Sequence, residues 1–400
     1  MSLLALLILA QPMNLNTSGS SQPVQGAFGA AVGVQETIPL NLSFPYNVLD
    51  PTAVIMETDA GTVTADGGHA IMTVGTTGWA EIRSRLSARY IPGQGMSARF
   101  TFVSDKSCHS KQTLEIGAGD EVDGFAFGCC PTCGLDGGAS FGVLRRSNSV
   151  DSWTPAARWN GAWGRTPPDI TYGRPYQIQW QWLGYGQITY FIEDEKTGAF
   201  VTAHSIRYAG TAINTSISNP TLPLHAHALS SGSDAGVVLR VPSMSMVRQG
   251  DEPVTGRRFS VSGTRAVTTS ETEVLTLKND IAFGGRVNRT NAHVDFLAWS
   301  LGTSAGTADV IVRIRLNPVH GGPAWRPANT YSMMSYDTDG GFASNGTEWM
   351  QFVASEGLSG TIDLRPYELH MAAGDSLMVT GTSSTGAPVL RISLSWVEER

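Results

Sequence analysis

Residues 172–191 read Tyr-Gly-Arg-Pro-Tyr-Gln-Ile-Gln-Trp-Gln-Trp-Leu-Gly-Tyr-Gly-Gln-Ile-Thr-Tyr-Phe, and this stretch decides the fold. Apolar side chains alternate with glutamines over 176–182, which predicts a strand with one buried face. After a glycine-containing turn at 183–186 the alternation resumes over 188–192, so the two strands form an antiparallel hairpin. Each large aromatic side chain on this face has about 150–250 Å² of surface to bury. A second sheet must cover the face, and the hairpin therefore predicts a β-sandwich.

The composition of the whole chain favours strands and turns. Its 400 residues include 45 glycines, and only 15% of the residues are charged. No convincing stretch has the i, i+3, i+4, i+7 spacing of an amphipathic helix, so we expect an all-β protein. The net charge of −7 argues against nucleic acid as a partner, because nucleic-acid binding needs a basic face.

Residues 1–38 form an N-terminal leader with no charged residue before Glu36. Its apolar run is too short to span a bilayer, which takes about 20 residues, and it lacks the positive flank of a secretory signal. Three interpretations stay open: a disordered tail, an uncut signal peptide, or an anchor that buries its side chains against a partner subunit. The anchor would consist of Leu3, Leu4, Leu6, Leu7, Ile8 and Leu9.

Two globular blocks follow the leader. The first, 39–248, has about a dozen strand-like segments at regular spacing, as expected for two packed antiparallel sheets. A polar, turn-forming linker at 249–258 separates it from the second block, 259–400. There the segment 309–316 alternates cleanly between apolar and polar side chains. About eight strands in this length predict a smaller, jelly-roll-like sandwich.

Several short motifs of the first block give it a resemblance to the concanavalin-like (laminin-G-like) sandwich. The resemblance implies the fold of that family and says little about function. The motifs are Leu114–Ile116, Asp123–Gly128, Phe141–Leu144, Tyr176–Trp180, Ile188–Asp194 and Thr197–Phe200.

Three groups of segments, taken with the order of the two blocks, resemble virion structural proteins of tailed bacteriophages and large DNA viruses. These are Phe141–Ser147 with Asp151–Pro155 and Trp159-Asn160; Asn219–Leu224 with Arg240–Met244; and Leu277–Asn279 with Arg286–Arg289 and Ser393–Glu398.

The resemblance implies a non-enzymatic component of a tail fibre, spike, baseplate or capsid decoration. It also implies location in the extracellular particle, a homotrimer, other virion proteins as partners, and host-surface attachment. The alternatives are a glycan-binding adhesin or, third, a secreted carbohydrate-active enzyme.

All four cysteines cluster in two segments of the first block. Cys130-x-x-Cys133, next to Cys129 and with Cys108-His109 upstream, could supply the ligands of a structural Zn²⁺. Two disulfides in any of three pairings fit the same count. Free thiols and a redox role are further alternatives. No other cofactor is indicated.

Carboxylates at Glu115, Asp120, Glu121 and Asp123 invite a glycosidase interpretation, because such enzymes use two carboxylates. Glycines at 117 and 119 interrupt the run, so an acidic turn is the preferred interpretation. Ca²⁺ binding by these oxygens is conceivable, but their spacing matches no specific loop.

Indoles gather in a loop rich in proline, glycine and arginine. Exposed indoles stack on sugar faces, and neighbouring arginine and asparagine side chains add directional hydrogen bonds. The alternative is that these rings cover the rim of the sandwich or a subunit interface, where tryptophan and arginine are enriched. The candidate glycan- or receptor-binding residues are Trp153, Arg158, Trp159, Asn160 and Trp163.

Two histidines, His225 and His227, share one face of a strand. Metal binding would need further ligands that the sequence does not identify, so a polar outer face or contact with a neighbouring subunit is expected. No Ser-His-Asp pattern, phosphate loop or dinucleotide fingerprint is recognised.

Overall fold

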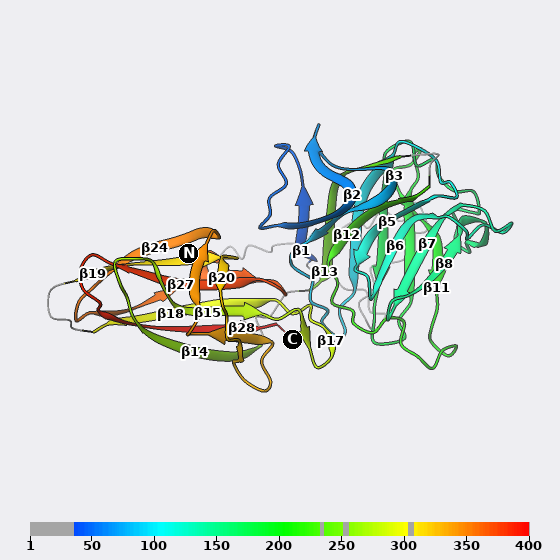
Figure 1. Ribbon diagram of the computed structural model, residues 1–400. Helices are drawn as coiled ribbons and strands as arrows, with labels where there is room; N and C mark the ends of the chain where they lie inside the picture. The colour runs from blue at the N-terminus through cyan, green and yellow to red at the C-terminus, as the bar shows by residue number, and fades with distance from the viewer. Residues whose placement is uncertain (1–35, 233–235, 251–255, 303–307, 400) are drawn as a thin grey trace, which may run out of the picture.

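The computed structural model describes residues 36–232, 236–250, 256–302 and 308–399. Within these ranges the chain is built from β-strands and two short 3-10 helices, which confirms the all-β expectation. Two hydrophobic cores lie in the two blocks, which stand side by side in Figure 1. None of the helices described is long and apolar enough to cross a membrane.

The first block contains strands β1 to β13 and the 3-10 helix η1. Their bounds are β1 (Glu36–Ser43), β2 (Val54–Asp66), β3 (His69–Ser84), β4 (Met96–Ser104), β5 (Gln112–Gly119), β6 (Gly124–Cys130), β7 (Ser140–Ser147), β8 (Val150–Pro155), η1 (Ala156–Arg158), β9 (Arg174–Trp180), β10 (Ile188–Glu193), β11 (Phe200–Ile206), β12 (Leu224–Ser231) and β13 (Val237–Gln249).

The second block contains strands β14 to β28 and the 3-10 helix η2. Their bounds are β14 (Arg257–Ala266), β15 (Thr272–Asn279), β16 (Ala282–Phe283), β17 (Arg286–Val287), β18 (Ala292–Leu301), β19 (Asp309–Leu316), β20 (Val319–Gly321), β21 (Arg326–Pro327), β22 (Met334–Asp337), β23 (Gly341–Ser344), β24 (Thr347–Ser355), β25 (Ser359–Asp363), η2 (Arg365–Tyr367), β26 (His370–Met371), β27 (Ser376–Ser383) and β28 (Val389–Glu398).

The predicted hairpin forms as β9 and β10, with Trp180 opposite Ile188. The alternating side chains Tyr176, Ile178 and Trp180 are at most 2% exposed, because strands β5 to β7 cover their face. Aromatic contacts join the two layers: the ring of Phe127 lies 5.0 Å from that of Tyr176, measured between centroids. The hairpin therefore supplies half of an aromatic core, as its sequence pattern requires.

The two layers of the first block are hydrogen-bonded into one curled sheet of 13 strands, all of whose pairings are antiparallel. Its order is β11-β10-β9-β4-β13-β3-β12-β5-β6-β7-β8, with β1 added on β13 and β2 on β3. Two separate sheets were expected from the sequence. The long strand β3 joins the two layers into one sheet, because its first half pairs with β13 and its second half pairs with β12.

A glycine permits the irregularity that β2 and β3 share at the middle of β3. Gly78 has φ +111°, and a Cβ there would lie 2.1 Å from the carbonyl oxygen of Asp59. The register of β2 against β3 shifts at this point, between Asp59 and Gly61. Only glycine combines this backbone conformation with so close an approach of the neighbouring strand.

The second block packs two sheets around its own core. One has the order β14-β28-β18-β25, with β26 added on β18, and the other has the order β21-β22-β15-β27-β19-β24. The predicted strand 309–316 is β19, in which Val310, Val312 and Ile314 are fully buried and Leu316 is partly buried. Strands β14 and β28, the first and last of the block, pair along their whole length from Arg257–Glu398 to Ala266–Val389.

The fold class is therefore the expected one: a concanavalin-like β-sandwich followed by a smaller jelly-roll-like sandwich. Strand β1 begins at Glu36, inside the stretch assigned to the leader. Strand β13 extends to Gln249 and β14 begins at Arg257, so strands reach into both ends of the proposed linker 249–258.

Candidate functional site

A shallow polar hollow lies on the face of the first block that points away from its aromatic core. Its volume is about 280 Å³. Strands β3, β5, β7, β8 and β12 and the turns beside them contribute its side chains. The polar hollow is lined by Glu81, Glu115, Glu121, Arg146, Ser149, Asp151, His225 and His227.

Strand register places three of these residues in one row. His227 of β12 is paired with Glu81 of β3 on one side and with Glu115 of β5 on the other. Residues that are paired across neighbouring strands point to the same face of a sheet, so the imidazole lies between two carboxylates. Further along the row come Gly128 and Gly142, which have no side chain to fill the space beside Glu115.

Arg146 organises the carboxylates at one end of the polar hollow. Its guanidinium donates to both oxygens of Glu115, at 2.8 and 3.0 Å, and to both oxygens of Asp151, at 2.6 and 3.1 Å. Glu115 is only 4% exposed, so this two-pronged contact compensates a carboxylate that is almost removed from water.

At the other end, Glu81 lies between two cationic groups. The Nε2 atom of His225 is 3.7 Å from Glu81, and the Nη1 atom of Arg83 is 3.6 Å from it. Burial alone would raise the pKa of Glu81, but the charges of His225 and Arg83 outweigh burial and lower its pKa to about 2. Burial likewise opposes protonation of His225, yet Glu81 raises the pKa of that histidine above its usual value.

His227 differs in its charge from His225, the other histidine that lines the polar hollow. Burial, together with the charge of His225, lowers its pKa, so its imidazole is neutral near pH 7. Neither ring nitrogen makes a hydrogen bond within the described ranges of the chain. Its ring lies 5.9 Å from that of the half-buried Trp79. A neutral imidazole can offer one donor and one acceptor to a ligand.

The predicted indole cluster does not form one exposed platform. Trp159 is 2% exposed and packs edge-on against Phe127 and Phe141 in the core. The expectation of a solvent-facing ring at Trp159 is therefore wrong: one apolar side chain in a loop has no periodicity to reveal which way it points. Trp163 is partly buried, and the guanidinium of Arg174 lies 5.4 Å from its ring centroid.

The remaining residues of that cluster have different surroundings. The side-chain amide of Asn160 is engaged with the backbone of Ser205, donating at 2.9 Å and accepting at 2.8 Å. Arg158 is exposed at the end of η1. Trp153 is half-buried on β8 and lies on the same sheet face as Asp151, two residues away, so it borders the polar hollow.

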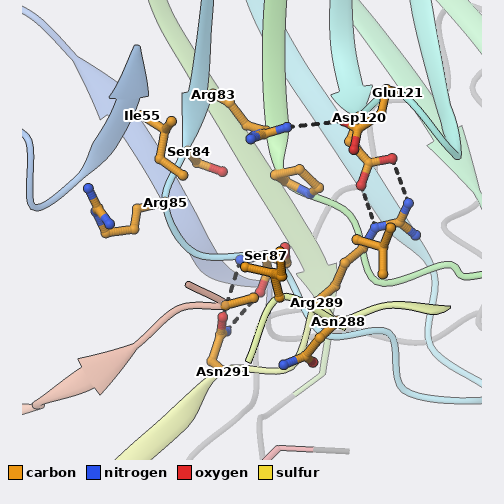
Figure 2. Close-up of a pocket in the computed structure, with 14 residues that line it drawn as sticks. Ile55, Arg83, Ser84, Arg85, Ser87, Asp120, Glu121, Asn288, Arg289 and Asn291 are labelled. Carbon is orange, nitrogen blue, oxygen red and sulfur yellow. Dashed lines mark hydrogen bonds and ion pairs between the residues drawn. The ribbon is translucent and has the colours of Figure 1, made fainter. Parts of the chain in front are cut away.

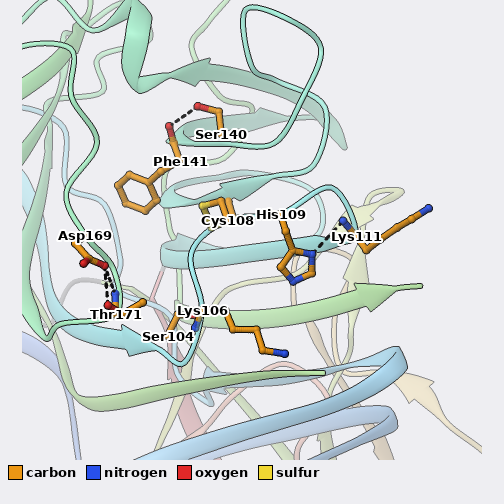
Figure 3. The surroundings of a disulfide bond; sticks show 10 residues. Ser104, Lys106, Cys108, His109, Lys111, Ser140, Phe141, Asp169 and Thr171 are labelled. Carbon is orange, nitrogen blue, oxygen red and sulfur yellow. Dashed lines mark hydrogen bonds between the residues drawn. A yellow bond between two sulfur atoms is a disulfide. The ribbon is translucent and has the colours of Figure 1, made fainter. Parts of the chain in front are cut away.

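The cysteines form two disulfides, and thiolates are therefore not available to a Zn²⁺ ion at this cluster. Cys108 is joined to Cys129 with a Cα–Cα distance of 5.4 Å, and Cys130 is joined to Cys133 at 5.6 Å. His109, which was a candidate ligand, points away from the bond and its Nδ1 atom accepts from the amide of Lys111 at 3.4 Å (Figure 3). The first disulfide ties the segment before β5 to the end of β6.

The predicted acidic turn connects the two blocks. Asp120 and Asp123 lie between β5 and β6, and both accept hydrogen bonds from Arg289, which precedes β18. Figure 2 shows the contact between Arg289 and Asp120. Burial would raise the pKa of Asp120, but its hydrogen bonds to Arg289 and the charge of that residue lower it. Glu115, assigned to the same turn, instead lies on β5 in the polar hollow. The anchor residues Leu3 to Leu9 fall outside the described residues.

Sequence reasoning identified the pair His225 and His227, and separately Glu115, but it did not identify Glu81 or place Glu115 beside the histidines. The alternation of β12 places both rings on one face, as expected for a polar outer face. The partners come from β3 and β5, which are distant in sequence, and only the register of the folded sheet brings them together. Glutamates at alternating positions of strand-like segments are the signal that could have indicated Glu81 and Glu115.

The chain resembles known proteins in three-dimensional structure but not in sequence. No family model and no curated protein sequence matches the chain. The Emp47p carbohydrate recognition domain is 8% identical over 56% of this chain and 100% of its own, with a TM-score of 0.38. Peanut lectin with a nine-residue peptide is 11% identical over 54% and 97%, with a TM-score of 0.35. A seed lectin of Lotus tetragonolobus is 10% identical over 54% and 100%, also with a TM-score of 0.35. At these identities no residue role transfers to this chain.

Proposed function

We propose that the chain is a non-enzymatic glycan-binding protein whose ligand occupies the polar hollow. The observation that carries the proposal is His227: a neutral, half-buried imidazole without a hydrogen-bond partner in the described structure, placed between Glu81 and Glu115. Sugar hydroxyls both donate and accept hydrogen bonds. The imidazole can match both functions, and the two carboxylates accept from neighbouring hydroxyls.

The charges of the polar hollow favour a neutral glycan. Four carboxylates line it against one arginine, while His225 and the neighbouring Arg83 add at most two further positive charges, which leaves an excess of negative charge. An anionic sugar would bring a further carboxylate or sulfate into this negative field and lose affinity through like-charge repulsion. Trp79 beside His227, and Trp153 at the border, offer apolar ring surface to a sugar face.

The states of the carboxylates support binding over hydrolysis. A glycosidase needs one carboxyl group that stays protonated to serve as a general acid. Glu81 has its pKa lowered to about 2, and Glu115 is held by both arms of the Arg146 guanidinium. Glu81 is therefore ionised at neutral pH, and both oxygens of Glu115 are occupied by the guanidinium. We therefore propose that the polar hollow binds a glycan without cleaving it.

The experiment is a glycan array probed with the full chain, followed by calorimetry with the best neutral glycan. His227→Ala should weaken binding by about tenfold or more, which corresponds to 1.4 kcal/mol. His69→Ala is the matched control, since His69 lies at the tip of the β2–β3 hairpin and outside the polar hollow. Absence of any glycan binding, or equal affinity of the His227→Ala variant, would contradict the proposal.

A hydrolysis assay separates binding from catalysis. The glycan found on the array is incubated with the protein and new reducing ends are measured. We expect none above background. Turnover that disappears in Glu115→Gln would refute the non-enzymatic part of the proposal and leave recognition in the polar hollow intact.

The proposed setting is the surface of a virion, where the chain would act in assembly and host attachment. Support for this setting comes from the sequence motifs that resemble virion structural proteins, and a fibre or spike can carry a glycan site. We expect a homotrimer. Mass photometry of the full chain tests this expectation, and a monomer at micromolar concentration would contradict it.

A further inference from the structure

Three side chains of the second block converge far from the polar hollow: Glu273 of β15, His320 of β20 and Asp337 at the end of β22. We propose that this Glu-His-Asp triad binds a divalent transition-metal ion, with Zn²⁺ as its most suitable representative. The inference is independent of the proposed glycan site.

The distances fit one metal ion. The Nε2 atom of His320 lies 2.8 Å from Oε1 of Glu273 and 3.5 Å from Oδ2 of Asp337, and all three atoms lie within 4.8 Å of one another. Ligands of tetrahedral zinc at about 2.0–2.1 Å are about 3.3 Å apart from each other. A small shift of the side chains would therefore place all three atoms around one ion, leaving one position for water.

The ligand atoms are shielded from solvent, and one of them belongs to a carboxylate that is incompletely satisfied. Glu273 is 1% exposed and Asp337 is 0% exposed. The Oε1 atom of Glu273 accepts from Thr276 at 2.5 Å, but its Oε2 atom is buried and has no hydrogen-bond partner within the described residues. A buried carboxylate oxygen without a partner is costly, and a cation beside it would remove that cost.

Two buried carboxyl groups of the triad face one imidazole. The Nδ1 atom of that imidazole is buried without a hydrogen-bond partner in the part of the chain that is described. A divalent ion between the three side chains would place two positive charges beside the two carboxyl groups. One nitrogen and two oxygen ligands suit Zn²⁺ better than Ca²⁺, which takes six to eight oxygens.

The surroundings orient the triad as in established metal sites, where ligating carboxylates are themselves hydrogen-bonded. Asp337 accepts from three backbone amides: Asp339 at 3.0 Å, Gly340 at 3.0 Å and Ala324 at 3.3 Å. The loop lies so close that a Cβ on Gly340 would be 2.2 Å from Cε1 of His320. His320 is on the small β20–β23 sheet, so a bound ion would tie that sheet to β15 and β22.

The test adds Zn²⁺ alone to the metal-stripped full chain and counts the metal retained after desalting. His320→Gln, which can keep a hydrogen bond to Glu273, should retain one equivalent less than the wild type. His69→Gln should match the wild type, and His227→Ala identifies any ion bound in the polar hollow. Zn²⁺ should raise the melting temperature of the wild type and leave that of His320→Gln unchanged.

Equal zinc retention by the wild type and a folded His320→Gln variant would overturn the proposal, because the triad would then hold no metal. Should that variant fail to fold, zinc-soaked crystals of the wild type decide the question. An anomalous difference peak within about 2.3 Å of the His320 Nε2 atom supports the site. A map without that peak rejects it.

Discussion

Replacing Arg289 by methionine tests how firmly the two blocks are joined. The guanidinium contacts Asp120 through two hydrogen bonds, at 2.6 and 2.5 Å (Figure 2). It contacts Asp123 through one hydrogen bond at 3.2 Å. None of the three side chains is more than 6% exposed. Methionine has similar length and no charge, so it fills much of the space but leaves the two carboxylates without their cation.

The expected loss follows from the burial of those carboxylates. Removing one partner of a buried ion pair costs about 3–5 kcal/mol, since an uncompensated charge stays in a poorly hydrated place. Asp123 keeps its hydrogen bonds from the amide and hydroxyl of Ser218, at 2.9 and 2.6 Å. Asp120 also keeps hydrogen bonds from the amides of Val122 and Asp123, at 2.9 and 3.0 Å. Because Asp120 loses two hydrogen bonds to the guanidinium and Asp123 loses one, most of the loss should come from Asp120. Arg289→Met combined with Asp120→Asn should recover part of it.

Equilibrium unfolding in urea, followed by fluorescence and circular dichroism, measures the loss. Arg326→Met is the matched control in the same block, because Arg326 and its partner Asp339 are 51% and 59% exposed. An exposed pair contributes less than about 1 kcal/mol. If Arg289→Met costs no more than this control, the buried contact does not stabilise the junction and the reasoning is wrong.

Three further predictions concern the first block. Trp159→Ala should lower stability by about 3–5 kcal/mol, because the indole fills the core; normal thermal stability with lost glycan binding would contradict this assignment. Removing the Cys108–Cys129 disulfide should cost about 3 kcal/mol, as expected for a closed loop of this length, and urea unfolding of a Cys108→Ser, Cys129→Ser double variant under non-reducing conditions measures it. Glu81 has a pKa lowered from 4.5 to about 2, so its contribution, up to about 3 kcal/mol, is present above pH 4.5 and lost as the pH falls towards 2. In Glu81→Gln the free energy of unfolding should fall less steeply between pH 4.5 and pH 2. An unchanged pH dependence in this variant would refute the lowered pKa of Glu81.

The sequence predicts those features that depend on local periodicity. The alternation over 176–182 and 309–316 is enough to identify strands and their buried faces, since every second side chain must find apolar surroundings. It also places His225 and His227 together on one face. The division into two sandwiches follows from the spacing of such strands.

Features that depend on pairing between distant segments could not be predicted in this way. The row of Glu81, His227 and Glu115 exists only because β12 inserts between β3 and β5. The contact of Arg289 with Asp120 joins two blocks whose individual patterns contain no sign of it. The buried position of Trp159 depends on how its loop packs on Phe127 and Phe141, which no local repeat encodes.

The pairing of β14 with β28 has a consequence for the order of folding. The β14–β28 ladder joins the first and last strands of the second block, so these two strands must meet before that ladder can form. Such a contact spans nearly the entire block, so closing the intervening loop carries a large entropic penalty before any neighbouring bond forms. We expect slow refolding of this block, with β18 exposing an open edge to aggregation until β28 arrives.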